Sequence, residues 1–231
     1  MNGTVTPNEA GGLVLGGSVV LILGLVGLSP TRWRAWLARL LRGDALEVAS
    51  VAAAKLGAGV AFAVASVIAL RFAMPEHAAI GWSVTLTGRA VALWVVAAVV
   101  CLTSVALASR QPAMRERYPE ARVARFGAAA RLADALGWLV YLYGYELLLR
   151  GVLLFPLVAL VPLGAALALH SALYALAHLD KPLAEILGTV PMGFVFGWLA
   201  IETGSVLPGF ALHAAIAITN STLCARRRGR A

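Results

Sequence analysis

Two charged residues, Glu146 and Arg150, lie one helical turn apart inside an apolar stretch of the chain. A charge at the centre of a bilayer costs roughly 2.5–3.5 kcal/mol even on the scale derived from membrane insertion. The i,i+4 spacing, with the acid first, is the favourable order for an ion pair on a helix. The pair therefore indicates either a structural contact between neighbouring helices or a site of chemistry.

Three of the four histidines, His170, His178 and His213, also fall within apolar segments of the last third of the chain. Tyr174 lies four residues before His178, so the two side chains share one helical face, which His170 extends by a turn. We interpret His170 as a packed structural residue. A neutral His213 is suited to donate to a developing oxyanion, the interaction that usually dominates acyl-group chemistry.

Two histidines and one glutamate also form a known zinc set, so zinc at His178, His213 and Glu146 is an alternative. No HExxH motif supports it, and we predict no metal and no other cofactor. The sequence contains no Gly-rich phosphate loop, no GxSxG nucleophile elbow and no CxxC pair. Cys101 and Cys224 are interpreted as small apolar side chains.

Composition predicts that the elements carrying these residues are membrane helices. Of 231 residues, 61% are hydrophobic and 13% are charged, whereas soluble domains contain about 25% charged residues. A spanning helix needs about 20 apolar residues. We predict an all-α, polytopic membrane helix bundle of about seven transmembrane helices, within a range of six to eight. The predicted spans are 11–28, 46–73, 90–108, 139–163, 164–179, 183–201 and 205–225.

The chain is predicted to have three parts: N-terminal spans in 1–125, a helical core in 126–225 that carries the chemical residues, and a basic cytoplasmic tail in 226–231. Within the first part, 31–44 is predicted to be an amphipathic helix in the headgroup layer, and 74–82 an outer loop.

Two boundary expectations concern buried charge. Lys55 is expected to snorkel from its span to the interface. The span with Glu146 is expected to begin near Leu139, which leaves 126–138 at the surface and gives Arg131 and Asp134 access to water.

The net charge of +8 comes from clusters of arginine between the apolar runs. This pattern is typical of cytoplasmic loops and predicts an integral membrane protein with its N-terminus outside and its C-terminus cytoplasmic. The arginines are then expected to contact the lipid bilayer. No nucleic-acid partner is expected, because no aromatic-rich basic groove accompanies the arginines. The Ala, Leu, Val and Arg content is compatible with a bacterial inner membrane. The clusters are Arg32, Arg34, Arg39 and Arg42; Arg110, Arg115, Arg117, Arg122 and Arg125; and Arg226, Arg227, Arg228 and Arg230.

Three segments in this order resemble the motifs of the CPBP (Abi) family of CAAX prenyl proteases and bacteriocin-processing membrane proteins. The family pattern is EExxxR, then FxxxH, then HxxxN or a relative of it. The corresponding segments are Glu146–Gly151, Tyr174–Leu179 and Thr203–Ala214. The resemblance covers roughly Trp138 to Asn220 and implies that 126–225 is a core of this catalytic type.

The resemblance implies an intramembrane endopeptidase of the glutamate type, which cleaves a membrane protein or peptide, for instance near a C-terminal tag. Carried over, Glu146 and His178 would activate a water and His213 would bind the oxyanion. Arg150 would fix Glu146.

This chain departs from the family pattern at three positions. Tyr145 stands where the family has its first glutamate, Ala217 where it has an asparagine, and Tyr174 where it has a phenylalanine. A tyrosine, with a reference pKa of about 10, cannot serve as a carboxylate base near neutral pH. Asn220 shares the face of His213 but lies about 10 Å further along the helix.

Three functions follow as hypotheses. The first is an endopeptidase whose site is rebuilt around Glu146. The second is a catalytically inactive relative that binds membrane peptides or a partner in immunity or secretion. The third is a small transporter with broken helices, which would use the prolines Pro156, Pro162 and Pro191.

Overall fold

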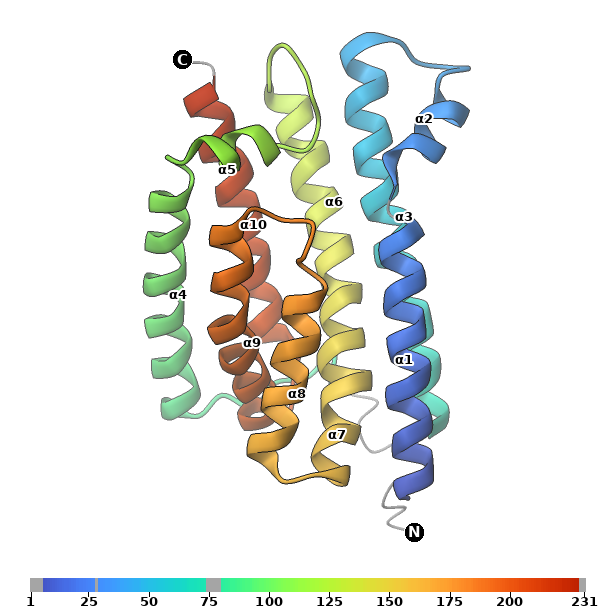
Figure 1. Ribbon diagram of the computed structural model, residues 1–231, viewed down its shortest axis with the longest axis vertical. Coiled ribbons are helices and arrows are strands. Elements are labelled where there is room, and N and C mark those ends of the chain that lie inside the picture. The colour runs from blue at the N-terminus through green and yellow to red at the C-terminus, as the bar shows by residue number, and fades with distance from the viewer. Residues whose placement is uncertain (1–5, 28, 74–79, 229–231) are drawn as a thin grey trace.

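The computed structural model describes residues 6–27, 29–73 and 80–228, and these contain helices and no strand (Figure 1). The predicted all-α bundle is therefore confirmed. The elements are α1 (Pro7–Gly27), α2 (Pro30–Leu37), α3 (Gly43–Ala73), α4 (Gly88–Ala108), α5 (Pro112–Arg117), α6 (Ala128–Glu146), the π-helix η2 (Leu147–Leu154), α7 (Phe155–Leu160), α8 (Leu163–Leu176), α9 (Leu183–Thr203) and α10 (Leu207–Arg228).

Six helical stretches among the described residues are long and apolar enough to cross a membrane, one fewer than the seven expected but within the predicted range. The predicted span 164–179 is the exception. It forms α8, a helix of 14 residues, which at 1.5 Å per residue is about 21 Å long. That length falls short of the hydrocarbon core of about 30 Å. The six stretches are Pro7–Leu25, Gly43–Ala73, Gly88–Ala108, Ala128–Leu160, Leu183–Thr203 and Leu207–Arg228.

The expected start of the fourth stretch near Leu139 is wrong. The helix begins at Ala128 and continues through η2 and α7 to Leu160. Asp134 and Trp138 are buried, whereas Arg131 is exposed. The segment needs no surface position, because Asp134 is neutralised inside the protein by Lys55, whose Nζ lies 2.8 Å from its Oδ1.

The same contact overturns the expectation that Lys55 reaches the interface. Its side chain is buried, and its Nζ also lies 3.3 Å from Glu120 and 3.7 Å from the centre of the Trp138 ring. A lysine stem can snorkel only where no acid is closer, and two carboxylates are closer here.

The predicted amphipathic helix 31–44 is shorter than expected. It is α2, which ends at Leu37, and a turn reverses the chain through Gly43, whose φ of +55° favours glycine. Trp33 of α2 lies against Gly57 of α3. The chain therefore folds back on itself here, with α2 packed on α3.

Two other predicted segments are only partly described. The outer loop 74–82 falls mostly on 74–79, and the tail 226–231 partly on 229–231, both outside the described residues. Residues 226–228 belong to the last turn of α10.

The closest helix contact joins α3 to α6 through two glycines. A Cβ on Gly144 would lie 2.1 Å from the carbonyl oxygen of Gly59, and a Cβ on Gly59 would lie 2.4 Å from that of Val140. Backbone atoms of the two helices therefore touch, as small residues permit in membrane bundles. This contact positions Tyr145 and Glu146, which follow Gly144 directly.

The described residues of the arginine clusters gather at one end of the bundle. The segment after α1 that contains α2, the segment around α5, and the C-terminal end of α10 all lie at the top of Figure 1, opposite the N-terminus. We call this the arginine end.

Candidate functional site

The centre of the site is the carboxylate of Glu146, which is fully buried at the last residue of α6. Its Oε1 accepts a hydrogen bond from His213 Nδ1 of α10 at 2.7 Å and another from Arg150 Nη1 at 3.0 Å. The predicted i,i+4 pair is therefore present. The contact with His213 joins two residues that are 67 positions apart in the sequence.

Arg150 is held in place by π-helical winding and by aromatic rings. It lies in η2, and π-helical turns are rare and frequently mark functional sites. Its guanidinium lies 4.7 Å from the centre of the Tyr174 ring and 5.2 Å from that of Phe196. These faces stabilise the cation away from water while one of its nitrogens binds Glu146.

Hydrogen bonding assigns the tautomer of His213. A carboxylate only accepts, so Nδ1 carries the proton in the contact with Glu146. In the neutral ring Nε2 then holds a lone pair, which faces the hydroxyl of Tyr174 at 3.4 Å. The carboxylate orients the imidazole and leaves Nε2 as the basic atom.

His178 has the same tautomer for a different reason. Its Nδ1 donates to the backbone carbonyl of Tyr174 at 2.8 Å, which leaves Nε2 as an acceptor. His178 reaches the site because α8 ends at Leu176, partway along the bundle (Figure 1). The short α8 therefore brings together side chains that a full span would separate.

The ring of Tyr145 lies among these groups. Its centre is 6.0 Å from that of His213, 6.4 Å from that of His178 and 6.2 Å from that of Tyr174. The side chain is buried, and its hydroxyl has no hydrogen-bond partner among the described residues. The same holds for Oε2 of Glu146 and for Nε and Nη2 of Arg150, so the site has unused hydrogen-bonding capacity.

The other predicted residues lie further out. Asn220 is buried on the wall of the same cavity, and its Oδ1 accepts from Cys224 Sγ at 3.4 Å. Ala217 lines the cavity one turn after His213. His170 is fully buried next to Gly197, between α8 and α9, as expected for a packed residue.

A cavity of about 1240 Å³ opens onto the site from between α4, α6, α9 and α10. Tyr145, Tyr174, His178 and His213 line its inner part, together with apolar side chains from α4 and α9.

The outer part of this cavity holds charged residues that the sequence analysis missed as a group. We call them the Lys55 network: Lys55, Asp134, Glu120, Lys181 and Arg117. Glu120 lies 3.3 Å from Lys55, 3.4 Å from Lys181 and 3.4 Å from Arg117. Burial alone would raise the pKa of Glu120, but these three cations lower it to about 2.

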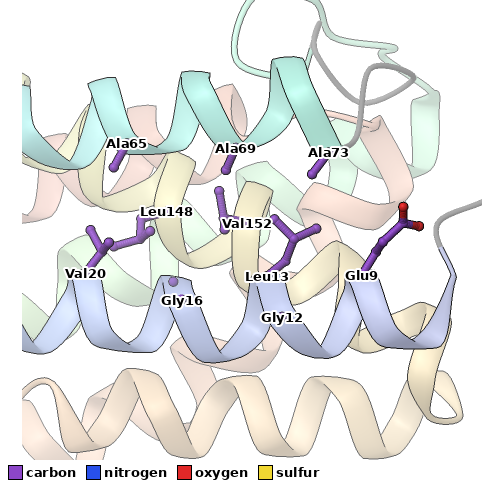
Figure 2. A pocket seen from close by; sticks show the side chains of 11 residues that line it. Glu9, Gly12, Leu13, Gly16, Val20, Ala65, Ala69, Ala73, Leu148 and Val152 are labelled. Carbon is purple, nitrogen blue, oxygen red and sulfur yellow. The ribbon is translucent and has the colours of Figure 1, made fainter.

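A smaller cavity of about 330 Å³ lies elsewhere, between α1, α3 and η2 (Figure 2). Apart from Glu9, its lining consists of glycine and aliphatic residues, among them Gly16, Ala69 and Val152. Glu9 is the one titratable side chain in this lining, and no histidine or second polar side chain accompanies it, so the site described above is the candidate.

Phe196 and Gly209 were also missed. A Cβ on Gly209 would lie 3.2 Å from Oε2 of Glu146, so a small residue here leaves that oxygen open. The only signal in the sequence was a glycine four residues before His213, within the third segment that resembles a family motif. Among the described residues, no group of three or more His, Cys, Asp or Glu side chains is placed to hold a metal ion. The absence of a cofactor stays a prediction.

The arrangement combines a carboxylate-oriented imidazole, a second imidazole with a free acceptor nitrogen, and an apolar cavity. Such a set can take a proton from water and return it to a leaving group. Residues 130–219 match a family model described as type II CAAX prenyl endopeptidase, Rce1-like. No curated protein and no solved structure matched the chain.

Proposed function

We propose that the chain, whose residues 130–219 match the Rce1-like type II CAAX prenyl endopeptidase family model, is an intramembrane endopeptidase. Its reaction is hydrolysis of a peptide bond in a membrane-associated substrate, for instance close to a C-terminal tag. The substrate is a membrane protein or peptide whose apolar part occupies the large cavity.

The hydrogen bond between Glu146 Oε1 and His213 Nδ1 is the observation that carries this proposal. It leaves Nε2 of His213 as a base that can take a proton from a water molecule, with Glu146 stabilising the imidazolium that forms. The sequence alone paired Glu146 with His178. Because the carboxylate contacts His213, we assign water activation to His213 and Glu146.

The remaining residues support this reaction. His178, with its free Nε2, accepts a hydrogen bond from the second O–H of the attacking water and so aligns the water. Arg150 holds the Glu146 carboxylate in position through its hydrogen bond to Oε1. Asn220 is placed outside the reacting atoms, on the cavity wall. We propose that the reaction needs no metal or other cofactor, because the Glu146–His213 pair supplies the base.

The test is cleavage of a farnesylated peptide with a C-terminal CAAX tag by the purified chain in proteoliposomes, with the released tripeptide measured by mass spectrometry. Glu146→Gln and His213→Ala are each expected to lower kcat/KM by roughly 100-fold or more, as loss of a general base does. Glu116→Gln is the matched control, because it makes the same carboxylate-to-amide change at an exposed residue of α5. Full turnover by both site variants would disprove the proposal.

The second candidate is an inactive relative that binds membrane peptides or a partner in immunity or secretion. Tyr145 and Ala217, both on the cavity wall, favour it. The double variant Tyr145→Glu with Ala217→Asn separates the two. This candidate predicts cleavage by the double variant only. It fails if the natural chain already cleaves as fast.

The six apolar helical stretches and the match of residues 130–219 to the family model support an integral membrane protein. We propose further that the membrane is a bacterial inner membrane, with the N-terminus outside and the arginine end cytoplasmic. The arginines then meet anionic lipid, and no nucleic-acid partner is proposed. Modification of a cysteine introduced at Gly11, near the N-terminal end of α1, by a membrane-impermeant maleimide added to intact cells tests the orientation.

A further inference from the structure

The environment of the Tyr145 hydroxyl is unusual for a buried phenol. The centre of the Tyr145 ring lies 6.3 Å from that of Phe62 and 5.6 Å from that of Tyr141, on which it stacks. The ring also lies edge-on to the imidazoles of His178 and His213. The side chain is 2% exposed, and its hydroxyl lacks a partner among the described residues. A buried hydroxyl without a partner costs roughly 1–3 kcal/mol, so this hydroxyl would gain from a hydrogen bond to a ligand in the cavity.

The cavity gives that ligand a location. Tyr145 lines the cavity together with His213 and His178, the two residues with acceptor nitrogens. Both imidazoles present Nε2 lone pairs, so neither neutral ring offers an N–H to an anion in the cavity. Arg150 is turned toward Glu146 and the rings of Tyr174 and Phe196. Among the described residues that line the cavity, Tyr145 is the one whose hydroxyl is buried and without a hydrogen-bond partner.

Tyr174 is less suited to the same task. Its hydroxyl already faces Nε2 of His213 at 3.4 Å, where it is a donor to the base. A phenol with a reference pKa of about 10 keeps its proton near neutral pH. Tyr145 is therefore both protonated and uncommitted.

We propose that the Tyr145 hydroxyl is the hydrogen-bond donor to the oxyanion of the tetrahedral intermediate, which makes Tyr145 a catalytic residue. This inference rests on the proposed endopeptidase function. The water oxygen bonds to the carbonyl carbon, one water proton moves to His213 Nε2, and the C=O pair moves onto oxygen. Tyr145 donates to that oxygen and keeps its own proton.

The second half of the reaction restores the enzyme. The electron pair returns from the oxyanion, the C–N bond breaks, and the proton on His213 moves to the leaving nitrogen. The products are a carboxyl end and a free amine. The donor acts mainly on the intermediate, because its hydrogen bond strengthens as charge develops.

The first test compares Tyr145→Phe with Tyr143→Phe on the farnesylated CAAX peptide. Tyr145→Phe keeps the ring and is expected to lower kcat by roughly 100-fold with little change in KM. Tyr143 lies on the same helix, but its hydroxyl donates to Gly81 O at 3.1 Å, outside the cavity. Its variant is expected to keep the natural kcat.

The second test measures binding without turnover, with the same peptide carrying a phosphinate in place of the scissile amide. Its P–O⁻ group has the charge of the oxyanion. Tyr145→Phe is expected to weaken phosphinate binding roughly 10-fold to 100-fold, the range for loss of one hydrogen bond to a charged group. Binding of the matched peptide with an N-methylated scissile amide is expected to stay unchanged.

The outcomes separate this inference from the proposed function. Natural kcat and natural phosphinate affinity in Tyr145→Phe would overturn the role of Tyr145. If Glu146→Gln is inactive in the same assays, the endopeptidase function stands without it. Failure of the natural chain both to cleave the peptide and to bind the phosphinate would overturn both.

Discussion

Two buried charge networks border the same cavity, one through Lys55 and Glu120 and the other through His213, the partner of Glu146. They differ in how completely their hydrogen-bonding groups are used. In the Lys55 network, the ammonium of Lys55 contacts two carboxylates and a tryptophan face, and Glu120 contacts three cations. Around Glu146, by contrast, one carboxylate oxygen carries both contacts, and the other has none among the described residues.

The difference teaches which network is structural. Burying a charge is tolerated when opposite charges are in contact, and every member of the Lys55 network contacts an opposite charge. The network joins α3, α6 and the α8–α9 turn. The Glu146 site leaves a carboxylate oxygen, two guanidinium nitrogens and a phenol available. Unused capacity in a cavity is a property of a site that binds a ligand, and four predictions test this contrast.

The largest expected effect on folding comes from Lys55→Met. It leaves Asp134 buried without the cation 2.8 Å away, and removing one partner of a buried pair costs roughly 3–5 kcal/mol. We expect a correspondingly lower free energy of unfolding in detergent titrations, and natural kcat per folded molecule.

The matched control for Lys55→Met is the double variant Lys55→Met with Asp134→Leu, which removes the stranded charge. It should recover most of the lost stability, since replacing a buried pair by apolar residues is often neutral. A kcat loss as large as that of Glu146→Gln would show that the Lys55 network belongs to the catalytic site.

The equivalent change in the second network, Arg150→Met, should have a smaller effect on folding and a larger one on turnover. Glu146 keeps its bond to His213, so only one charged hydrogen bond is lost, worth roughly 1.5–3 kcal/mol. Misplacement of the carboxylate by about 1 Å is expected to lower kcat about 100-fold. Kinetics and unfolding on the same preparation measure both. Equal kcat in the Lys55→Met and Arg150→Met variants would remove the distinction.

Glu120 gives the Lys55 network a pH dependence. Its pKa is lowered from 4.5 to about 2 by Lys55, Lys181 and Arg117, which outweigh burial. A depressed carboxyl pKa stabilises the fold above the unfolded value, and this stability is lost as the pH falls from about 4.5 toward 2. Glu120→Gln should be less stable at pH 7 and should lack this part of the acid loss. Thermal unfolding at pH 7 and pH 3 gives the comparison, and parallel acid profiles would contradict it.

The sequence predicted the local part of the Glu146 site well. Composition and helix length indicated a membrane bundle, and the i,i+4 spacing indicated the pair of Glu146 with Arg150, which the structure contains. The motif resemblance singled out His178 and His213, and both lie on the large cavity. Contacts within one helical turn follow from helix geometry alone, which explains this success.

Long-range contacts were not predictable in the same way. Lys55 and Asp134 are 79 residues apart, and they meet because Gly59 and Gly144 allow the backbones of α3 and α6 to touch. Isolated glycines have no periodicity that would reveal this contact. The choice of His213 over His178 as the partner of Glu146 likewise depends on where α8 ends. The sequence did not reveal this end, because apolar residues continue beyond it.

The smallest expected effect is that of metal removal, and it tests what the Glu146 carboxylate is used for. In the proposed reaction Glu146 Oε1 accepts from His213 Nδ1, and this geometry directs the proton-bearing nitrogen at the carboxylate, where a shared metal ligand would present a lone pair. Dialysis against EDTA, followed by assay with o-phenanthroline, is therefore expected to leave kcat unchanged within about twofold, on the reasoning that the imidazole itself supplies the base. Loss of turnover that added Zn²⁺ restores would instead assign Glu146, His178 and His213 to a zinc set. The Lys55 network would keep its structural role in that case, because its contacts are between protein charges alone.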